Sequence, residues 1–174
     1  MRPRPDYLSG YPEALAQQAR VLIEQGELGV RLLQKYPVAH AIRTDRALYD
    51  YMVRLKQEFL RNAERLNRVA YDSSMQLMER ALGMHAGISR VQGARLKVAR
   101  EIRVAALFRE TPPEFLRMIA VHELAHFRER EHNRAFYQLC VHMEPRYLEL
   151  EFDLRAYLCY LDGGGEPLWR GAPA

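Results

Sequence analysis

Apolar residues recur at helical spacing through the first part of the chain. A helix is expected over residues 12–25, and its apolar face consists of Leu15, Ala19 and Leu22. Gly26 would end this helix, and a second short helix is expected over residues 28–36. Thr44 or Asp45 then caps a third helix, whose apolar stripe is Leu48, Met52, Leu55 and Phe59.

The pattern changes near residue 66, where shorter apolar runs replace the helical stripes. Residues 67–72 predict a short strand. Residues 83–91 and 94–99 lie on either side of a Gln92-Gly93 turn and predict a β-hairpin. The apolar run over residues 103–108 is short enough to form a further strand. A small β-sheet is therefore expected in the middle of the chain.

Helical periodicity returns in the last third of the chain. Thr111 and Glu114 match a capping box, with Thr111 as the N-cap of a helix that is apolar on most sides. Further helices are expected over residues 133–143 and 145–161, and the Gly/Pro-rich residues 162–174 predict a flexible tail.

These elements predict an α+β fold. Its parts are N-terminal helices, a small β-sheet, a buried core helix and C-terminal helices. We expect one domain over residues 1–161, with a helical N-terminal part at residues 12–65.

The core helix carries a His-Glu-x-x-His motif, in the stretch Val121-His122-Glu123-Leu124-Ala125-His126. In a helix, His122 and His126 lie one turn apart and about 40° apart around the axis, so both imidazoles can bind one metal ion. Glu123 lies at the flank of that face, where a carboxylate can reach a water on the metal without being a ligand.

A third histidine, His132, follows six residues after His126. A straight helix would place it about 15 Å from His122 along the axis, whereas zinc–nitrogen bonds are about 2.0–2.1 Å long. The helix must therefore end soon after His126, and the chain must turn back. Residues 128–131 are polar and suit an exposed turn, although they include no glycine, and Asn133 is suited to cap the next helix.

The motif points to hydrolysis at a zinc ion. The simplest alternative is an amphipathic helix with two surface histidines, but Val121, Leu124 and Ala125 favour a buried setting, where unpartnered histidines cost free energy. Three neutral histidines leave a fourth zinc position for water, whose proton Glu123 can accept. We therefore expect one Zn²⁺ ion, with another divalent metal as the alternative.

Composition and cysteine use describe an ordinary globular protein. Hydrophobic residues make up 48% and charged residues 28% of the 174 positions. No apolar run approaches the roughly 18 residues that span a membrane, and the N-terminus lacks an apolar signal segment. Cys140 and Cys159 lie in apolar helical patterns, so we expect them to be reduced core residues of a cytoplasmic protein.

The formal net charge of +4 is unevenly distributed. Residues 86–134 carry 10 basic and 6 acidic side chains, whereas residues 135–174 carry 3 and 6. This mixture favours a solvated surface of both signs over a dedicated polyanion site and argues against nucleic acid as the partner.

Several segments together resemble the YgjP-like metal-dependent hydrolases, which are related to the WLM and SprT-type zincins. The resemblance covers nearly the whole chain up to about residue 161. Besides the motif, it is carried by Tyr7-Leu8-Ser9-Gly10-Tyr11-Pro12, by Leu82-Gly83-Met84-His85-Ala86-Gly87-Ile88-Ser89-Arg90-Val91-Gln92-Gly93, by Glu101-Ile102-Arg103-Val104-Ala105 and by His132-Asn133-Arg134-Ala135-Phe136-Tyr137. Broader members have a Trp-Gly-Ser-Cys type segment where this chain has residues 89–93, which leaves the substrate contacts unassigned.

The resemblance implies a zincin-like α+β fold and a set of site residues. His122, His126 and His132 would bind the metal, and Glu123 would be the catalytic base. The implied substrate is a nucleoside triphosphate, UTP in particular, from which pyrophosphate is released, or a peptide. We favour the nucleotide, because arginines precede the core helix and flank the third histidine. Candidate substrate or transition-state contacts are His85, Arg90, Arg134 and Tyr137.

Two other functions stay open on the residues alone. One is a metallopeptidase of the WLM or SprT type. A metzincin-type protease is disfavoured, because Glu129 stands where that group has glycine and no Met-turn follows. The other is a non-enzymatic basic binding module with a structural metal, although structural zinc sites normally use four protein ligands. The oligomeric state cannot be read from the residues.

Overall fold

The N-terminal helices form where the apolar stripes predict them. The computed structural model describes residues 5–74 and 100–170. The first three helices are α1 (Glu13–Glu24), α2 (Leu28–Lys35) and α3 (Asp45–Phe59). Gly26 turns the chain between α1 and α2 with a φ of 71°, a conformation that disfavours residues with a Cβ atom. Thr44 caps α3, because its hydroxyl oxygen accepts a hydrogen bond of 3.1 Å from the Ala47 amide.

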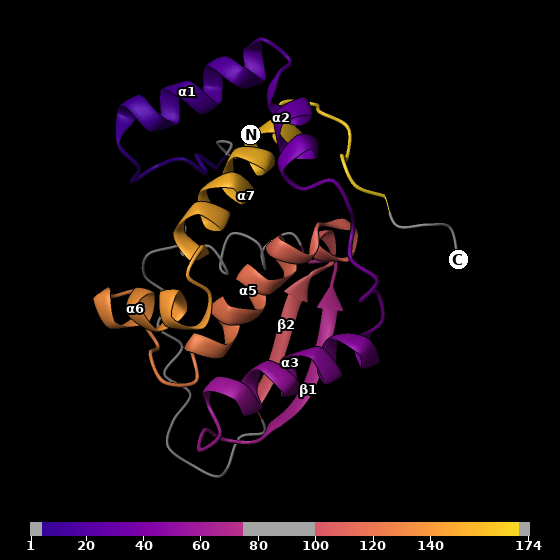
Figure 1. Cartoon of the computed structure of the whole chain (residues 1–174), viewed down its shortest axis with the longest axis vertical. Helices are drawn as coiled ribbons and strands as arrows, with labels where there is room; N and C mark the ends of the chain where they lie inside the picture. Colours follow the sequence, from indigo (N-terminus) through magenta and orange to yellow (C-terminus); the bar gives the residue numbers. More distant parts are fainter. Residues whose placement is uncertain (1–4, 75–99, 171–174) are drawn as a thin grey trace.

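Two parallel strands form the described part of the sheet (Figure 1). β1 spans Leu66–Asp72, as predicted, and β2 spans Arg100–Ala105. In their register Val69 lies opposite Ile102, and both are buried. α3 packs along β1 and covers one side of this sheet.

The strand expected over residues 103–108 is wrong in its bounds. β2 ends at Ala105, because its partner β1 ends at Asp72, directly opposite. The following residues form a 3₁₀ helix, η1 (Ala106–Glu110), which buries Phe108 completely. The predicted hairpin over residues 83–99 lies outside the described residues.

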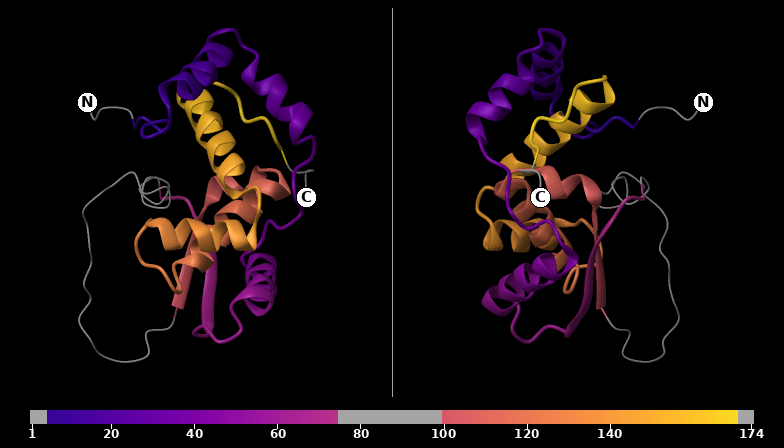
Figure 2. Two further views of the ribbon diagram at one scale, coloured as in Figure 1. Left: turned by 60° about the vertical axis from the view of Figure 1, so that its left-hand side comes forward. Right: turned by 90° about the vertical axis from the view of Figure 1, so that its right-hand side faces the viewer.

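Three further helices complete the fold: α5 (Pro113–Ala125), α6 (Arg134–Met143) and α7 (Tyr147–Asp162). Asn133 caps α6 as predicted, because its side-chain oxygen accepts a hydrogen bond of 2.9 Å from the Phe136 amide. α7 runs from the side of α5 and α6 toward the end of the molecule that holds α1 and α2 (Figure 2).

The capping box predicted for α5 does not form. Pro112 is the N-cap residue, and no side chain caps the helix. The Thr111 hydroxyl instead donates a hydrogen bond of 3.1 Å to the carbonyl oxygen of Phe108. Thr111 is thus used to close the turn after η1, and Pro113 begins the helix without an amide hydrogen that needs a partner.

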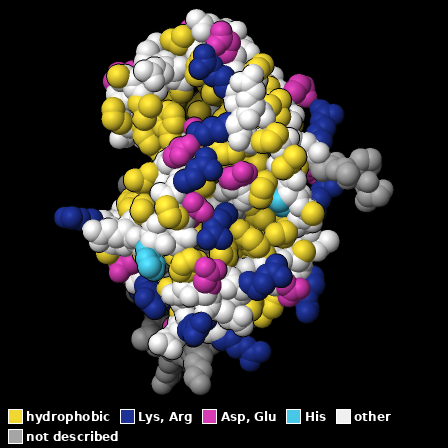
Figure 3. All heavy atoms as spheres, in the orientation of Figure 1, with side chains coloured by type: hydrophobic (Ala, Val, Ile, Leu, Met, Phe, Trp, Pro, Cys, Tyr) yellow, Lys and Arg dark blue, Asp and Glu magenta, His cyan; other side chains and the backbone are white. Residues whose placement is uncertain are grey.

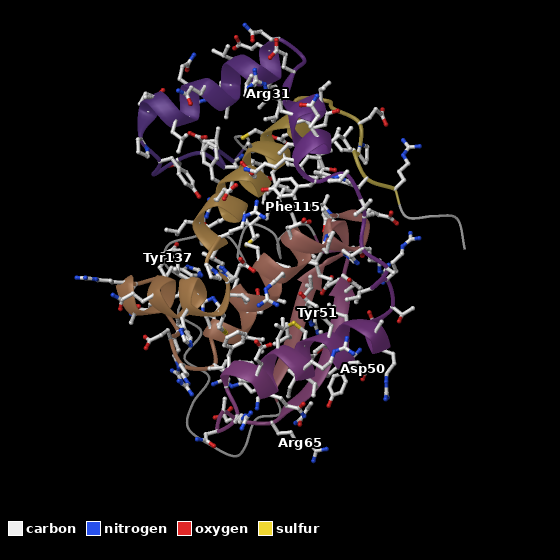
Figure 4. All side chains as sticks on the ribbon, viewed as in Figure 1. Arg31, Asp50, Tyr51, Arg65, Phe115 and Tyr137 are labelled. Atoms are coloured by element: carbon white, nitrogen blue, oxygen red, sulfur yellow. The ribbon has the colours of Figure 1, made fainter. Side chains whose placement is uncertain are left out.

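Phe115 lies where α2, α5 and α7 meet (Figure 4). Its ring packs against Tyr36 and Trp169, at centroid distances of 5.0 and 5.5 Å. Trp169 is 3% exposed, and its indole N–H donates a hydrogen bond of 2.7 Å to the Tyr36 carbonyl oxygen. The expectation of a loose tail after residue 161 therefore does not describe Trp169, whose large apolar ring fills a gap between helices.

The fold is α+β, as predicted, with helices that enclose a small parallel sheet. Among the described residues, no helix is both long and apolar enough to cross a membrane. The chain is arranged so that α5 lies in the centre, between α3, α6 and α7 (Figure 1).

Candidate metal centre

Two histidines of the motif lie at the end of the buried helix α5. His122 belongs to the helix, and His126 is its C-cap residue, with φ −64° and ψ −11°. Val121, Leu124 and Ala125 are all fully buried, so the helix is held on almost every side. This packing leaves the last turn little freedom to move, which suits the placement of functional side chains.

The chain turns back after His126, as the third histidine requires. The Phe127 amide donates to the carbonyl of Leu124, and the Arg128 and Glu129 amides both donate to the carbonyl of Ala125. These short-range bonds tighten the end of the helix without a glycine. The cap of α6 at Asn133 then fixes the far side of the turn.

Three imidazole nitrogens converge at this turn. The Nε2 atoms of His122 and His126 are 3.3 Å apart, and that of His132 lies 3.1 Å from each of the other two. The described residues contain this one cluster of side chains that could hold a metal ion. A tetrahedral ion with bonds of about 2.0–2.1 Å separates its ligands by about 3.3–3.4 Å, so the triangle fits a zinc-sized ion with a small expansion.

The Nδ1 atoms of His122 and His126 have hydrogen-bond partners that orient these two imidazoles. Nδ1 of His126 donates a hydrogen bond of 2.9 Å to the Glu129 carbonyl oxygen. Nδ1 of His122 lies 2.7 Å from the hydroxyl of Tyr147. With Nδ1 protonated, each Nε2 atom presents its lone pair to the centre of the triangle.

The ring of Phe136 packs against all three imidazoles. Its ring centroid lies 4.9 Å from that of His122, 4.7 Å from that of His126 and 4.8 Å from that of His132. Phe136 is fully buried, and α6 carries it beneath the cluster two residues after the helix begins. A rigid apolar ring in this position restricts the rotation of the imidazoles and keeps water away from that side.

The surroundings keep the histidines neutral, which metal binding requires. Burial and the neighbouring His126 lower the pKa of His132 to about 4. Burial also lowers the pKa of His126, against the opposing effect of its backbone hydrogen bonds, and lowers that of His122 well below the usual range.

Glu123 has the properties that a general base at this position needs. Burial raises the pKa of its carboxyl group to about 7. A base whose pKa lies near the working pH transfers protons most effectively. The cause is the partly buried position of this side chain, directly after His122 in α5.

Sequence reasoning missed a buried polar chain on α7. Tyr147, which contacts His122, is fully buried, and Glu151 and Arg155 are 5% and 7% exposed. Arg155 donates to Glu151 Oε1 from Nη2 at 2.9 Å and from Nε at 3.1 Å. The signal in the sequence was an acid and an arginine four residues apart in a largely apolar helix.

The candidate substrate contacts divide into three groups. Tyr137 lies where α6 approaches α7, with its ring 5.3 Å from Phe136 and 6.3 Å from Tyr147 (Figure 4). Arg134 begins α6 and is exposed to solvent. His85 and Arg90 lie outside the described residues. On the face drawn in Figure 3, basic and acidic side chains are interspersed, as expected for a solvated surface of both signs.

The fold and this site define a zincin-like hydrolase. The chain belongs to the YgjP-like family, because the family model described as "YgjP-like, metallopeptidase domain" matches residues 51–157. It is 54% identical over 158 residues to the UTP pyrophosphatase of Escherichia coli (strain K12), and this match covers 91% of the chain and 95% of that protein. No solved structure matches the chain. The family confirms the resemblance that the motif and its flanking segments carry.

Proposed function

We propose that the protein is a zinc-dependent nucleoside triphosphate pyrophosphatase that acts on UTP. The observation that carries this proposal is the 54% identity to a UTP pyrophosphatase over nearly the full length of both chains. The metal-competent histidine cluster beside Glu123 supplies a site with suitable chemistry. The reaction adds water to UTP and gives UMP and pyrophosphate.

In this proposal His122, His126 and His132 hold the zinc ion through their Nε2 atoms. When bound, the ion supplies positive charge and lowers the pKa of a coordinated water toward about 7. Glu123 accepts a proton from the attacking water. The new bond joins the water oxygen to the α-phosphorus, and the bond from that phosphorus to the bridging oxygen breaks, so that pyrophosphate leaves with the electron pair.

The triphosphate needs positive charge beyond that of the metal, because it carries several negative charges. Arg134 and Tyr137 lie on the first turn of α6, directly after His132. Arg128 and Arg130 are exposed in the turn between the second and third histidines. We propose that Arg134 and Tyr137, together with His85 and Arg90, contact the phosphates.

Peptide hydrolysis is the second candidate, because the matched family domain is described as a metallopeptidase domain. The same histidines and Glu123 would serve, with a carbonyl carbon in place of phosphorus. A purely structural metal fits less well. Structural zinc sites use four protein ligands, whereas the cluster found in residues 5–74 and 100–170 has three members.

The test compares three forms of the zinc-loaded protein: the parent, Glu123→Gln and Glu131→Gln. Glu123→Gln preserves size and cannot accept the proton, whereas Glu131→Gln removes an exposed carboxylate in the turn between α5 and α6. Each is assayed on UTP, other nucleoside triphosphates and unfolded casein. We expect pyrophosphate release from UTP by the parent and by Glu131→Gln, and a loss of about 10²-fold or more in Glu123→Gln.

Two results would change the proposal. Casein cleavage without triphosphate turnover would replace the nucleotide substrate with a peptide. Full UTP turnover by Glu123→Gln would remove the assigned base. Zinc content, measured on the same samples, must stay near one ion per chain in all three forms, and His126→Ala should lose most of it.

A further inference from the structure

Within residues 5–74 and 100–170, the polar side chains behind His122 have no counterpart at His126. His126 is held by the Glu129 carbonyl of its own turn, at 2.9 Å. His122 is held by a side chain, because its Nδ1 atom lies 2.7 Å from the Tyr147 hydroxyl. Tyr147 belongs to another helix and comes 25 residues later in the chain. The orientation of His122 therefore depends on a group that a single substitution can remove.

Donors and acceptors in this chain follow from the chemistry of its groups. Arg155 can only donate, and it donates to Oε1 of Glu151. The Glu151 carboxylate lies near the Tyr147 hydroxyl, and burial together with this negative charge raises the pKa of Tyr147 well above its usual range. The second carboxylate oxygen, Oε2, is buried and has no hydrogen-bond partner among the described residues. An ionised carboxylate only accepts, so a hydroxyl beside it can serve it only as a donor.

The consequence for His122 is a defined tautomer. The Nε2 atom of His122 faces the other two histidines, so a neutral ring that offers this lone pair to a metal carries its proton on Nδ1 and donates it to the Tyr147 oxygen at 2.7 Å. Nδ1 then carries the proton, and Nε2 has a free lone pair directed at the other two histidines.

We propose that Tyr147 is a positioning residue for the metal centre: buried beside the Glu151–Arg155 pair, its hydroxyl fixes the tautomer and ring orientation in which His122 presents Nε2 to the metal. This inference rests on the proposed metal site. His122, Tyr147, Glu151 and Arg155 are each less than a tenth exposed, so water cannot replace the hydroxyl without rearrangement. Partners of this kind typically change metal affinity 10–100-fold when they are removed.

A matched control comes from Tyr36, which is also fully buried and whose hydroxyl contacts an acid of α7. Its hydroxyl donates a hydrogen bond of 2.6 Å to Asp153, and its ring is fully buried, as that of Tyr147 is. Both Tyr147→Phe and Tyr36→Phe remove one buried hydroxyl and keep the ring. The two variants differ in one respect: the Tyr147 hydroxyl contacts a histidine of the cluster, whereas the Tyr36 hydroxyl contacts Asp153.

The experiment measures zinc affinity of the parent and both variants by competition with a chromophoric chelator. We expect Tyr147→Phe to bind zinc 10–100-fold more weakly and Tyr36→Phe to match the parent within about twofold. Equal affinities in all three forms would overturn the inference and leave the proposed function intact. A parent that binds no zinc would overturn both.

Nitrogen-15 NMR of the histidine rings gives a second readout, which also applies if Tyr147→Phe does not fold. In the zinc-loaded parent, the His122 ring should carry its proton on Nδ1, and its Nε2 shift should be that of a coordinated nitrogen. In a folded Tyr147→Phe, the Nδ1 proton signal should broaden or shift, whereas Tyr36→Phe leaves it unchanged. A parent His122 without a proton on Nδ1 would refute the assigned tautomer.

Discussion

Two polar networks on α7 begin in the same way and end differently. In the outer network (Tyr36, Lys35, Glu149 and Asp153), the Tyr36 hydroxyl donates to Asp153, and Lys35 bridges Asp153 and Glu149. In the inner network (His122, Tyr147, Glu151 and Arg155), a tyrosine hydroxyl again interacts with an acid of α7. The outer network opens to solvent, whereas the inner network ends at the metal-competent histidines.

The difference lies in burial. The side chains of Lys35, Glu149 and Asp153 are 39%, 46% and 16% exposed. Those of Glu151 and Arg155 are 6% and 9% exposed. Water screens the outer pairs, which therefore add little stability beyond joining α2 to α7. The Arg155–Glu151 pair of the inner network is desolvated, so removing either charge would leave the other buried without a counter-ion.

The largest expected effect comes from removing one charge of the inner network. Arg155→Met leaves Glu151 buried without its cation, so we expect the free energy of unfolding of the metal-free protein to fall by about 3–5 kcal/mol. Denaturant unfolding at neutral pH measures the change. Arg146→Met is the control, since Arg146 pairs with Glu149 while both are nearly half exposed, and it should cost less than about 1 kcal/mol. Equal losses in the two variants would mean that burial does not distinguish the networks.

Metal removal should change the free energy of unfolding of Tyr147→Phe less than that of Tyr36→Phe. At a zinc concentration about 100-fold above the parent's dissociation constant, bound metal contributes about 2.7 kcal/mol to the free energy of unfolding. A chelator removes this contribution. Tyr147→Phe should lose about 1.3 kcal/mol or more of it, because its affinity is at least tenfold lower, whereas Tyr36→Phe should keep it. Thermal unfolding with and without chelator provides the comparison, which fails if the two variants respond alike.

The pH dependence of turnover tests the carboxylate that lies beside the inner network. Burial raises the pKa of Glu123 to about 7, so its base form is lost as the pH falls through that value. We expect kcat/KM to fall about tenfold per pH unit on the acid side, with a midpoint at or below pH 7, because a bound cation lowers the pKa of a nearby carboxyl group.

Glu149 in the outer network provides the contrast, since Lys35 and Arg146 lower the pKa of its carboxyl group and keep it ionised across this range. Residual activity of Glu123→Gln should show no such acid limb. An unchanged limb in that variant would assign the titration to another group.

The smallest expected effect is that of Lys35→Met. Lys35 is more than a third exposed, so the loss of its bridge to Asp153 and Glu149 should change the free energy of unfolding by no more than about 1 kcal/mol. Zinc affinity should match that of the parent. A lower zinc affinity would show that the outer network also acts on the metal centre, and the comparison between the networks would then no longer hold.

Much of the site could be predicted from the sequence because its chemistry is local. The spacing of His122 and His126 places both on one helical face, and the position of His132 required the turn that the structure contains. Asn133 and Thr44 cap helices as their side chains predict. Thr111 was predicted as a cap and is not one, because its hydroxyl is used by the Phe108 carbonyl, a local competitor that the capping pattern does not reveal.

The sequence by itself determined the helices, whose apolar stripes depend on neighbours within a turn or two, and the three histidines that could hold a metal ion. Only the tertiary structure decided which distant side chains meet. Tyr147 reaches His122 across 25 positions, and Trp169 reaches Tyr36 across 133. Such contacts arise because burying large rings and pairing buried polar groups is favourable wherever the packing of helices brings them together, and no short-range pattern in the chain encodes that meeting.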